Sequence, residues 1–399
     1  MDASTLDRLA DLLVGFGANV QPGQIVAVGS ELGKEELTRR VVASAYRHGA
    51  RFVDVSYWDP HVKRERILHA AEDTLEFVPL WYGERVLALG RERAARIHLA
   101  GAAEPGLLED LDPVRAGRDQ LPRVVEMLQV VQERTTNWTI GPAPTPGWAQ
   151  QVFPELDAGE ALRALEDDVL HVLRLDAEDP VAAWRERQDA LVAAAEKLGA
   201  RRFAALRFRG PGTDLRVGLL PSSRWIAARF ETAEGIVHAP NLPSEEVFTT
   251  PDPEQTEGHV TATKPLVLGG QIVEGLRVEF AGGRAVRIDA ERGREAMETL
   301  VGKDDGGVRL GEVALVDGSG RIGPLGRVFY DTLLDENAAS HVALGQAYGF
   351  AVDDDGDRER ANSSQIHTDF MIGAPEVEVL GVEADGTEVP VLSDGVWRL

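Results

Sequence analysis

Residues 24–55, QIVAVGSELGKEELTRRVVASAYRHGARFVDV, decide the fold of the first part of this chain. Gln24–Val28 and Arg51–Val55 are short apolar runs that predict buried strands. Between them, the spacing of apolar residues over Glu31–His48 predicts an amphipathic helix. A strand, a helix and a strand at this spacing indicate a βαβ unit, and therefore a parallel sheet.

The alternation of helix and strand continues on both sides of this stretch. Leucines and Phe16 between residues 6 and 16 have helical spacing, and apolar segments follow at Arg85–Leu89 and Arg96–Ala100. The Pro- and Gly-rich run at residues 141–147 predicts a stiff loop within this region. Ala182–Leu198 is predicted to be a helix that Gly199 ends.

After this helix the chain changes to short strands separated by Gly and Pro. The predicted strands are Arg202–Phe208, Asp214–Leu219, Trp225–Ala228, His259–Thr263, Leu276–Phe280, Ala285–Asp289 and Glu312–Val316. We therefore predict two domains. The first, residues 1–185, is an α/β domain with a largely parallel sheet, and the second, residues 186–399, is an α+β domain with mixed or antiparallel strands.

Composition excludes several classes of function. The 399 residues include 42 Lys and Arg against 66 Asp and Glu, a net charge of −24, which disfavours nucleic acids and anionic membrane surfaces as partners. Cysteine is absent, so disulfides, a thiol nucleophile and thiolate metal sites are excluded. We find no apolar run of membrane-spanning length and no signal-peptide profile, and we expect a cytoplasmic protein.

Four segments of the second domain carry the residues best suited to chemistry. They are NLPSEEVFTTP at 241–251, LGEVA at 310–314, LDENAASHVALGQAY at 334–348 and IHTDFM at 366–371. Together they supply carboxylates, two imidazoles and a phenol, a ligand set that suits a pair of divalent metals. Two dications would outweigh three carboxylates, polarise a carbonyl and lower the pKa of a bound water.

Local geometry gives further expectations. Asp335 can cap a helix from Glu336 to about Gln346, in which His341 and Tyr348 would share a face. In a strand, His367 and Asp369 would point to the same side, and Glu312 would open an otherwise apolar strand. Each residue alone also fits an ordinary role: a turn cap for Glu246, a favourable helix N-terminus for Glu336, a satisfied helix residue for His341, or a surface strand for His367 and Asp369.

Taken together, the four segments resemble the M29 family of metallo-aminopeptidases, also called thermophilic aminopeptidases. The family's Pro-x-x-Glu-Val-Phe-Thr, Leu-Gly-Glu, Asp-Glu-Asn-Ala-x-x-His-x-Ala-x-Gly and His-x-Asp motifs occur here in order, with a weaker match at residues 144–149 and 210–215. The resemblance implies that the metal ligands are Glu246, Glu312, His341, His367 and Asp369. It implies that Tyr348 lies beside the metals and that Glu336 is the catalytic acid/base. Glu245 is the adjacent alternative to Glu246.

The resemblance implies a two-metal aminopeptidase that removes the N-terminal residue from short peptides with a free N-terminus. Zinc is the expected metal, with cobalt or manganese as alternatives, and a homodimer is implied whose N-terminal domain restricts access to the site. One rival is a mononuclear iron dioxygenase that cleaves rings with His341, His367 and Asp369. Another is a metal-binding protein without turnover. Glu246 and Glu312 discriminate against the iron enzyme, because only a second metal needs them.

Overall fold

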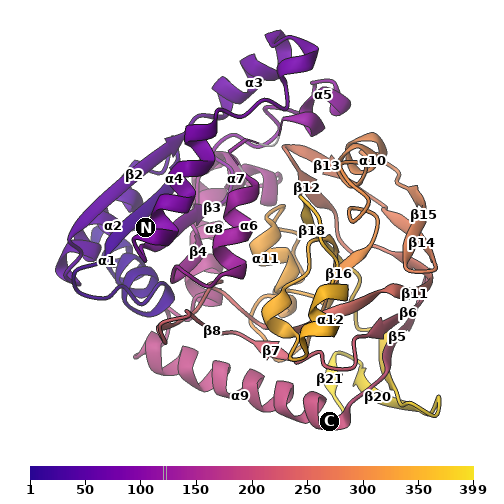
Figure 1. The fold of residues 1–399 in the computed structure, drawn as a ribbon. Helices are drawn as coiled ribbons and strands as arrows, with labels where there is room; N and C mark the ends of the chain where they lie inside the picture. The colour runs from indigo at the N-terminus through magenta and orange to yellow at the C-terminus, as the bar shows by residue number, and fades with distance from the viewer. Residues whose placement is uncertain (120, 123) are drawn as a thin grey trace. The chain divides into compact units, whose positions relative to one another are not determined.

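The computed structural model describes residues 1–119, 121–122 and 124–399, which divide into two compact units (Figure 1). The first unit comprises Met1–Gln188 and Ala228–Ser244, and the second comprises Asp189–Ala227 and Glu245–Leu399. The first crossing falls within the long helix α9 (Pro180–Arg201). The chain then returns to the first unit over residues 228–244 before it completes the second.

The first unit is built on a parallel sheet of strand order β2-β1-β3-β4. Its strands are β1 (Ile25–Glu31), β2 (Phe52–Trp58), β3 (Ala95–Ala100) and β4 (Trp138–Pro142). Its helices are α1 (Ala3–Asp11), α2 (Glu35–Arg47), α3 (Pro60–His69), α4 (Leu80–Arg91), α5 (Pro113–Arg118), α6 (Val125–Gln132), α7 (Pro146–Val152) and α8 (Ala158–Val172). The predicted α/β class with a parallel sheet is therefore confirmed.

The predicted βαβ unit is β1-α2-β2. Helix α2 buries Leu37, Val41 and Ala45, which recur every four residues and form one apolar stripe. Connections between parallel strands of one sheet are right-handed. The chain crosses this sheet in one direction from β1 to β2 and in the opposite direction from β2 to β3. Helices α2 and α4 therefore cover opposite faces of this sheet.

Several boundaries differ from their sequence-based predictions. Helix α9 continues through Gly199, which was predicted to end it, as far as Arg201. Helix α2 begins at Glu35 rather than Glu31, because β1 continues through Glu31 in register with β2. The stretch 141–147 is less of a loop than predicted, since its start completes β4 and its end opens α7. Thr145 accepts the Trp148 N–H at 3.2 Å and Pro146 takes the first helical position, so the same residues that break a pattern also begin a helix.

The returning segment 228–244 lies beside the edge strand β4 of the first unit. It contains the short strands β8 (Phe230–Glu231) and β9 (Val237–His238). Ile140 forms a parallel bridge with Asn241, and the Ile140 N–H donates to the Pro240 carbonyl at 2.8 Å. The segment therefore satisfies backbone groups that an edge strand would otherwise leave unpaired.

The second unit contains two antiparallel sheets and one small hairpin. An eight-stranded sheet has the order β15-β14-β11-β6-β5-β19-β20-β21, and a five-stranded sheet has the order β18-β17-β16-β10-β7. The first comprises β5 (Ala205–Gly210), β6 (Thr213–Leu219), β11 (Pro251–Thr261), β14 (Arg277–Ala281), β15 (Arg284–Asp289), β19 (Glu378–Val382), β20 (Glu388–Ser393) and β21 (Val396–Trp397). The second comprises β7 (Ile226–Ala227), β10 (Glu246–Thr249), β16 (Leu310–Val316), β17 (His341–Gly345) and β18 (His367–Met371).

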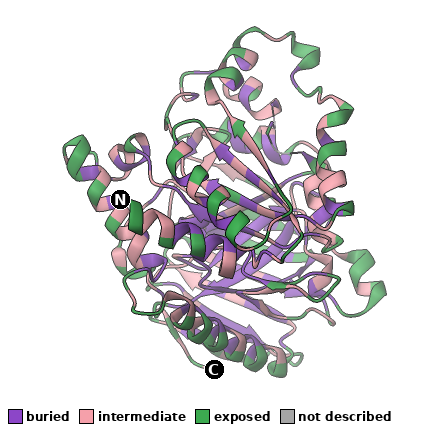
Figure 2. Ribbon diagram, turned by 90° about the vertical axis from the view of Figure 1, so that its left-hand side faces the viewer, coloured by how far each residue is buried: buried purple, intermediate pink, exposed green. Residues whose placement is uncertain are grey.

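The strands of the two sheets alternate along the chain, and Thr250 alone separates β10 of one sheet from β11 of the other. The hairpin pairs β12 (Leu266–Leu268) with β13 (Gln271–Val273), and the helices are α10 (Arg294–Val301), α11 (Thr332–Glu336) and α12 (Asp355–Arg360). Strands β10, β16 and β17 are buried along their whole length. Figure 2 shows the buried strands of the molecule as purple arrows. This antiparallel architecture confirms the predicted α+β class.

Within the described residues, the structure contains no helix that is both long and apolar enough to span a membrane.

Candidate metal centre

Four neighbouring strands of the five-stranded sheet carry the five predicted metal ligands. Glu246 opens β10, Glu312 lies in β16, His341 opens β17, and β18 supplies both His367 and Asp369. These strands are adjacent in the order β18-β17-β16-β10. We call these five residues the carboxylate–imidazole cluster.

The strand register places the whole cluster on one face of this sheet. Side chains of directly paired residues point to the same side, and so do side chains two residues apart along a strand. The relevant pairs are Glu246 with Val316, Ala314 with His341, Glu312 with Ala343, Ala343 with Asp369, and Gly345 with His367. Small residues at 314, 343 and 345 lie among the cluster side chains on this face.

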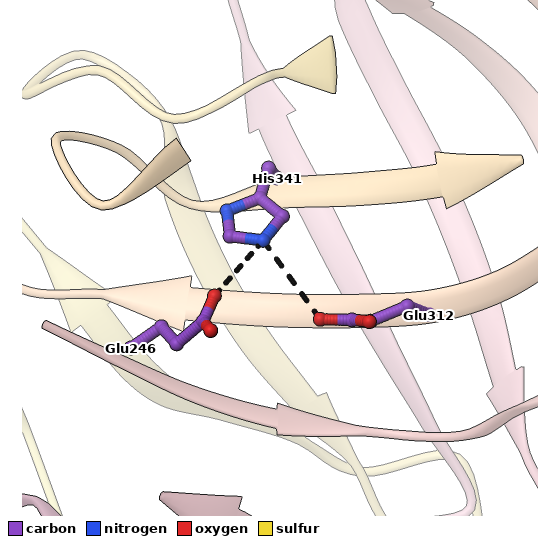
Figure 3. Close-up of side chains that lie close together, drawn as sticks. All are labelled: Glu246, Glu312 and His341. Carbon is purple, nitrogen blue, oxygen red and sulfur yellow. Dashed lines mark ion pairs between the residues drawn. The ribbon is translucent and has the colours of Figure 1, made fainter. Parts of the chain in front are cut away.

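His341 faces two carboxylates, Glu312 from the neighbouring strand β16 and Glu246 from β10, the next strand beyond it (Figure 3). Its Nε2 is 3.1 Å from Oε2 of Glu246 and 3.8 Å from Oε1 of Glu312. Potential ligand atoms of these three residues lie within 4.8 Å of one another, and all three residues are buried. The arrangement is compact enough for one cation to contact all three.

A second group of three shares Glu312 with the first. Nε2 of His367 is 3.4 Å from Oε2 of Glu312 and 3.7 Å from Oδ1 of Asp369. These ligand atoms also lie within 4.8 Å of one another. The two oxygens of Glu312 therefore face different histidines, Oε1 toward His341 and Oε2 toward His367.

Backbone carbonyls orient both imidazoles. Nδ1 of His341 lies 3.1 Å from the Ala339 carbonyl, and Nδ1 of His367 lies 2.7 Å from the Gln346 carbonyl. Because a carbonyl can only accept, Nδ1 must carry the proton in each hydrogen bond. Each Nε2 is thereby directed at the carboxylates, as in histidines that bind metals.

The pKa values in this cluster respond to an excess of negative charge. Burial lowers the pKa of His367, but the charge of Asp369 and the hydrogen bond and charge of Glu312 raise it to about 9. Burial also opposes protonation of His341, yet its close contact with Glu246 and the charges of the surrounding carboxylates raise its pKa well above the usual value. Burial raises the pKa of Glu312 itself. The cluster therefore strongly favours bound positive charge.

The donor set fits a metal ion by a further criterion. Oε2 of Glu246 is buried, and among the described residues no group donates a well-directed hydrogen bond to it. The nearby Nε2 of His341, at 3.1 Å, forms an ion pair without that geometry. A buried carboxylate oxygen in this condition is costly unless a cation compensates it. Nitrogen and oxygen donors in this combination suit zinc, cobalt or manganese.

Glu336 lies beside the cluster as the last residue of α11. It is 8% exposed, and its Oε1 accepts a hydrogen bond from Asn337 Nδ2 at 3.4 Å. Burial, followed by the charges of Asp369 and Glu246, raises the pKa of Glu336 well above its ordinary value, while His341 opposes the rise. The charges of the cluster residues therefore act directly on the protonation of Glu336.

The helix predicted from Glu336 to about Gln346 is wrong. Helix α11 ends at Glu336, and residues 341–345 form strand β17, paired with β16 on one side and β18 on the other. A short apolar run has no periodicity that separates a strand from a buried helix, and pairing on both sides decided the outcome. His341 and Tyr348 therefore do not share a helix face, and Glu336 does not share a helix with His341.

Tyr348 nevertheless reaches the cluster by another route. It immediately precedes the 3₁₀ turn Gly349–Ala351, and its ring centroid lies 5.1 Å from that of His367 and 5.6 Å from that of Phe248. Loss of solvent around the phenol, followed by the charges of Glu312 and Asp369, raises the pKa of Tyr348 well above its usual value. The phenol is therefore protonated and able to donate a hydrogen bond.

Two supporting residues escaped the sequence analysis as functional candidates. Asn337 accepts the Glu245 N–H at 2.7 Å and donates to the Leu333 carbonyl at 2.9 Å, so it joins the approach to β10 to helix α11. Ala343 lies opposite both Glu312 and Asp369. Both residues belong to the Asp-Glu-Asn-Ala-x-x-His-x-Ala-x-Gly motif, which was the available signal. Glu245 is fully buried, and its carboxyl lies beside Gly320 rather than in the cluster.

Comparison with known proteins gives matches along the whole chain. A family model described as "Thermophilic metalloprotease (M29)" matches residues 2–397. The chain is 42% identical to Aminopeptidase T of Thermus aquaticus over 407 residues, covering 100% of both proteins. It is 36% identical to Aminopeptidase PepS of Streptococcus thermophilus, covering 98% of this chain and 97% of that protein. The solved structure of wild-type AmpT from Thermus thermophilus superposes with a TM-score of 0.88 at 41% identity, covering 99% of each chain.

Proposed function

Because the chain belongs to the M29 family of thermophilic metalloproteases, we propose that it is an aminopeptidase that removes the N-terminal residue from short peptides with two divalent metal ions. The observation that carries the proposal is the pair of three-residue groups that share Glu312. The relatives described above are aminopeptidases, which supports an exopeptidase activity. Four carboxylates around the site, counting Glu336, favour the positively charged amine of a peptide N-terminus.

We assign the ligands to the two groups according to their distances. His341 with Glu246 and Glu312 would hold one ion, and His367 with Asp369 and Glu312 would hold the other. Zinc is our proposed metal, with cobalt or manganese as the alternatives that the same donors accept. Bound ions of this kind polarise a scissile carbonyl and lower the pKa of a water molecule.

The protein's own groups supply proton transfer and orientation. The Glu336 carboxylate would accept a proton from the attacking water and pass it to the leaving amine. The Tyr348 phenol would donate a hydrogen bond to the oxyanion that develops on the carbonyl oxygen. The Ala339 and Gln346 carbonyls hold the two imidazoles in place during turnover, because each accepts the Nδ1 proton.

The ring-cleaving dioxygenase is not supported. The relatives described above are named as aminopeptidases. An iron triad of His341, His367 and Asp369 would leave Glu246 and Glu312 without a function, although both lie in the cluster. A metal-binding protein without activity would bind the ions but would not hydrolyse peptides, so an assay of peptide hydrolysis distinguishes it from the aminopeptidase.

The direct test measures metal content and activity on the same sample. Protein stripped with a chelator is titrated with zinc while hydrolysis of leucine p-nitroanilide is followed. We expect activity to rise until two ions are bound per chain. A fully active sample with one ion per chain would contradict the two-metal proposal. Hydrolysis that is independent of metal would contradict the metalloenzyme.

Family resemblance also leads us to propose a cytoplasmic homodimer in which the first unit restricts access to the site. Light scattering on the eluting peak of a size-exclusion column measures the mass directly. We expect twice the mass of one chain. A monomer of full activity would remove the dimer from the proposal without affecting the chemistry.

A further inference from the structure

A second site of interest is a cavity of about 350 Å³ within the second unit. Three arginines, Arg202, Arg216 and Arg360, contribute to its lining, together with Trp225, Asp252 and Gln255. None of the cluster residues lines it. We call it the arginine cavity.

One of the three guanidinium groups is neutralised by carboxylates. Asp252 is 1% exposed, and its Oδ2 accepts hydrogen bonds from Arg360 Nη2 at 2.6 Å and from Gln255 Nε2 at 2.9 Å. Nη1 of Arg360 lies 3.2 Å from Oδ1 of Asp357. The buried Asp252 therefore fixes Arg360 and Gln255 at the cavity wall, and two carboxylates balance the charge of Arg360.

Arg216 differs, because within the described residues it forms no ion pair or hydrogen bond through its side chain. The acid directly opposite it on β11, Glu257, instead accepts the Gly282 N–H at 2.7 Å. On the other side it faces Arg207, whose Nε is 2.9 Å from Oδ1 of Asp214. The acids beside Arg216 on its own and the facing strand, Asp214 and Glu257, thus have other partners.

Arg202 is also unpaired among the residues that the structure describes. It directly follows the last residue of α9, and Leu198 and Gly199 of that helix help to line the cavity. The carbonyl end of the helix offsets part of its charge. Two unpaired guanidiniums in one cavity are notable in a chain with 66 acids and 42 bases.

We propose that the arginine cavity binds a small dianion of the phosphate class, either inorganic phosphate or a phosphate monoester. Arg202 and Arg216 supply two positive charges with planar arrays of N–H donors, which match the oxygens of such a group. Gln255 and Arg360 are held in place by Asp252 and complete the donor set. The partly exposed indole of Trp225 provides an apolar wall for the organic part of a monoester.

The test measures binding of inorganic phosphate and of adenosine monophosphate to the full chain by titration calorimetry at constant ionic strength. We expect saturable binding of at least one of them, and roughly 10-fold or greater weakening in Arg216→Gln, because a charge-assisted contact is lost. Arg216→Lys keeps the charge but not the planar donors and should weaken binding less. Arg284→Gln is the matched control: Arg284 is an exposed arginine of the same sheet, unpaired among the described residues and outside the cavity.

The two sources of the dianion are distinguished with Trp225→Leu. The ligand is a monoester if adenosine monophosphate binds more tightly than phosphate and if Trp225→Leu removes this difference without affecting phosphate binding. Equal affinities that are insensitive to Trp225→Leu identify inorganic phosphate.

Three results would overturn the proposal: no saturable binding, affinity unchanged in Arg216→Gln, or an equal loss in Arg284→Gln. Unchanged affinity would assign the anion to another place, such as the metal centre. If Arg216→Gln lowers the unfolding temperature, Arg202→Gln serves as the second variant, because Arg202 lies outside the strands.

Discussion

At Glu336, burial and the neighbouring carboxylates act in the same direction. Both disfavour the ionised carboxylate, and the pKa of Glu336 is raised well above its ordinary value for that reason. Divalent cations beside the carboxylate would favour ionisation again. A carboxyl group under these opposing influences can both accept and release a proton, which is the property that general acid–base catalysis needs.

Replacing Glu336 with Gln separates proton transfer from structure. The amide keeps the size of the side chain but cannot accept the proton. We expect kcat for peptide hydrolysis to fall by about 10²–10⁴-fold, a typical contribution of general acid–base catalysis. We expect stability to be equal or higher, since an unfavourably buried acid is removed. Steady-state kinetics and thermal unfolding on the same preparation provide both measurements.

Two further variants complete this test. Glu295→Gln alters an acid in the first turn of α10 and should leave kcat unchanged. His341→Ala removes a proposed ligand and should lose metal and activity together. Normal kcat in Glu336→Gln would assign proton transfer to another group. Loss of metal in that variant would assign Glu336 to the ligands or their support.

At the scale of elements, strand β17 shows what could be predicted and what could not. The strand around Glu312 was predicted from its apolar run, and the strand of His367 and Asp369 from the alternation of its side chains. The run from His341 to Gly345 is also apolar, but it was mistaken for a helix because Asp335 upstream suggested a helix cap. Its strand conformation depends on β16 and β18, which are distant along the chain.

Strand β17 also provides a test of the space between the ligands. Ala343 is fully buried and lies opposite Glu312 and Asp369, so a larger side chain there would enter the region between them. We expect Ala343→Leu to weaken zinc binding at least 10-fold and to destabilise the fold by roughly 1–3 kcal/mol through overpacking. Competition with a chromophoric chelator measures the affinity. Val342→Ile, on the opposite face of the strand, should leave it unchanged; equal weakening would contradict the geometry.

Strand β9 of the first unit contains a histidine that should make stability depend on pH. His238 is 4% exposed, packs near Trp138 and Phe230, and its Nε2 has no hydrogen-bond partner among the described residues. Burial lowers its pKa to about 4 from 6.5. The unfolded chain therefore binds the proton first as the pH falls through 6.5, and stability is progressively lost until about pH 4.

Linkage gives the size of this effect. Between pH 7 and pH 5, His238 should cost about 2 kcal/mol of the free energy of unfolding. Urea unfolding at both pH values measures it, and His238→Phe should abolish that part of the change while keeping the ring packing. The exposed His69 provides a control, since His69→Phe should retain the full pH dependence. An unaltered pH dependence in His238→Phe would show that His238 is not the group responsible.

At the scale of the whole molecule, charge bears on substrate choice. A net charge of −24 attracts cationic groups over a range set by salt. We expect kcat/KM for peptides with a free amine to fall as ionic strength rises. N-acetylation of a good substrate should abolish cleavage, because the amine is both the recognised charge and the mark of the N-terminus. Equal cleavage of free and acetylated peptides, measured by chromatography of the products, would indicate an endopeptidase.

The arrangement of the site also belongs to this scale. Family resemblance named five cluster residues in segments from residue 246 to residue 369, but their common face follows from strand register, which no short motif encodes. Likewise, the sequence predicted one boundary near residue 185 and did not predict that the chain returns to the first unit over residues 228–244. The segment 228–244 pairs with β4 through backbone hydrogen bonds, which almost any sequence can form.

This return of the chain has a consequence for synthesis on the ribosome. A nascent chain that has emerged only to Gln188 lacks residues 228–244, so the edge of β4 is still open when the first unit is otherwise complete. Domains ordinarily fold in order as they emerge, at about 5–20 residues per second. Here the N-terminal unit is complete only after Ser244 has left the exit tunnel, by which time β5, β6 and β7 have already been made.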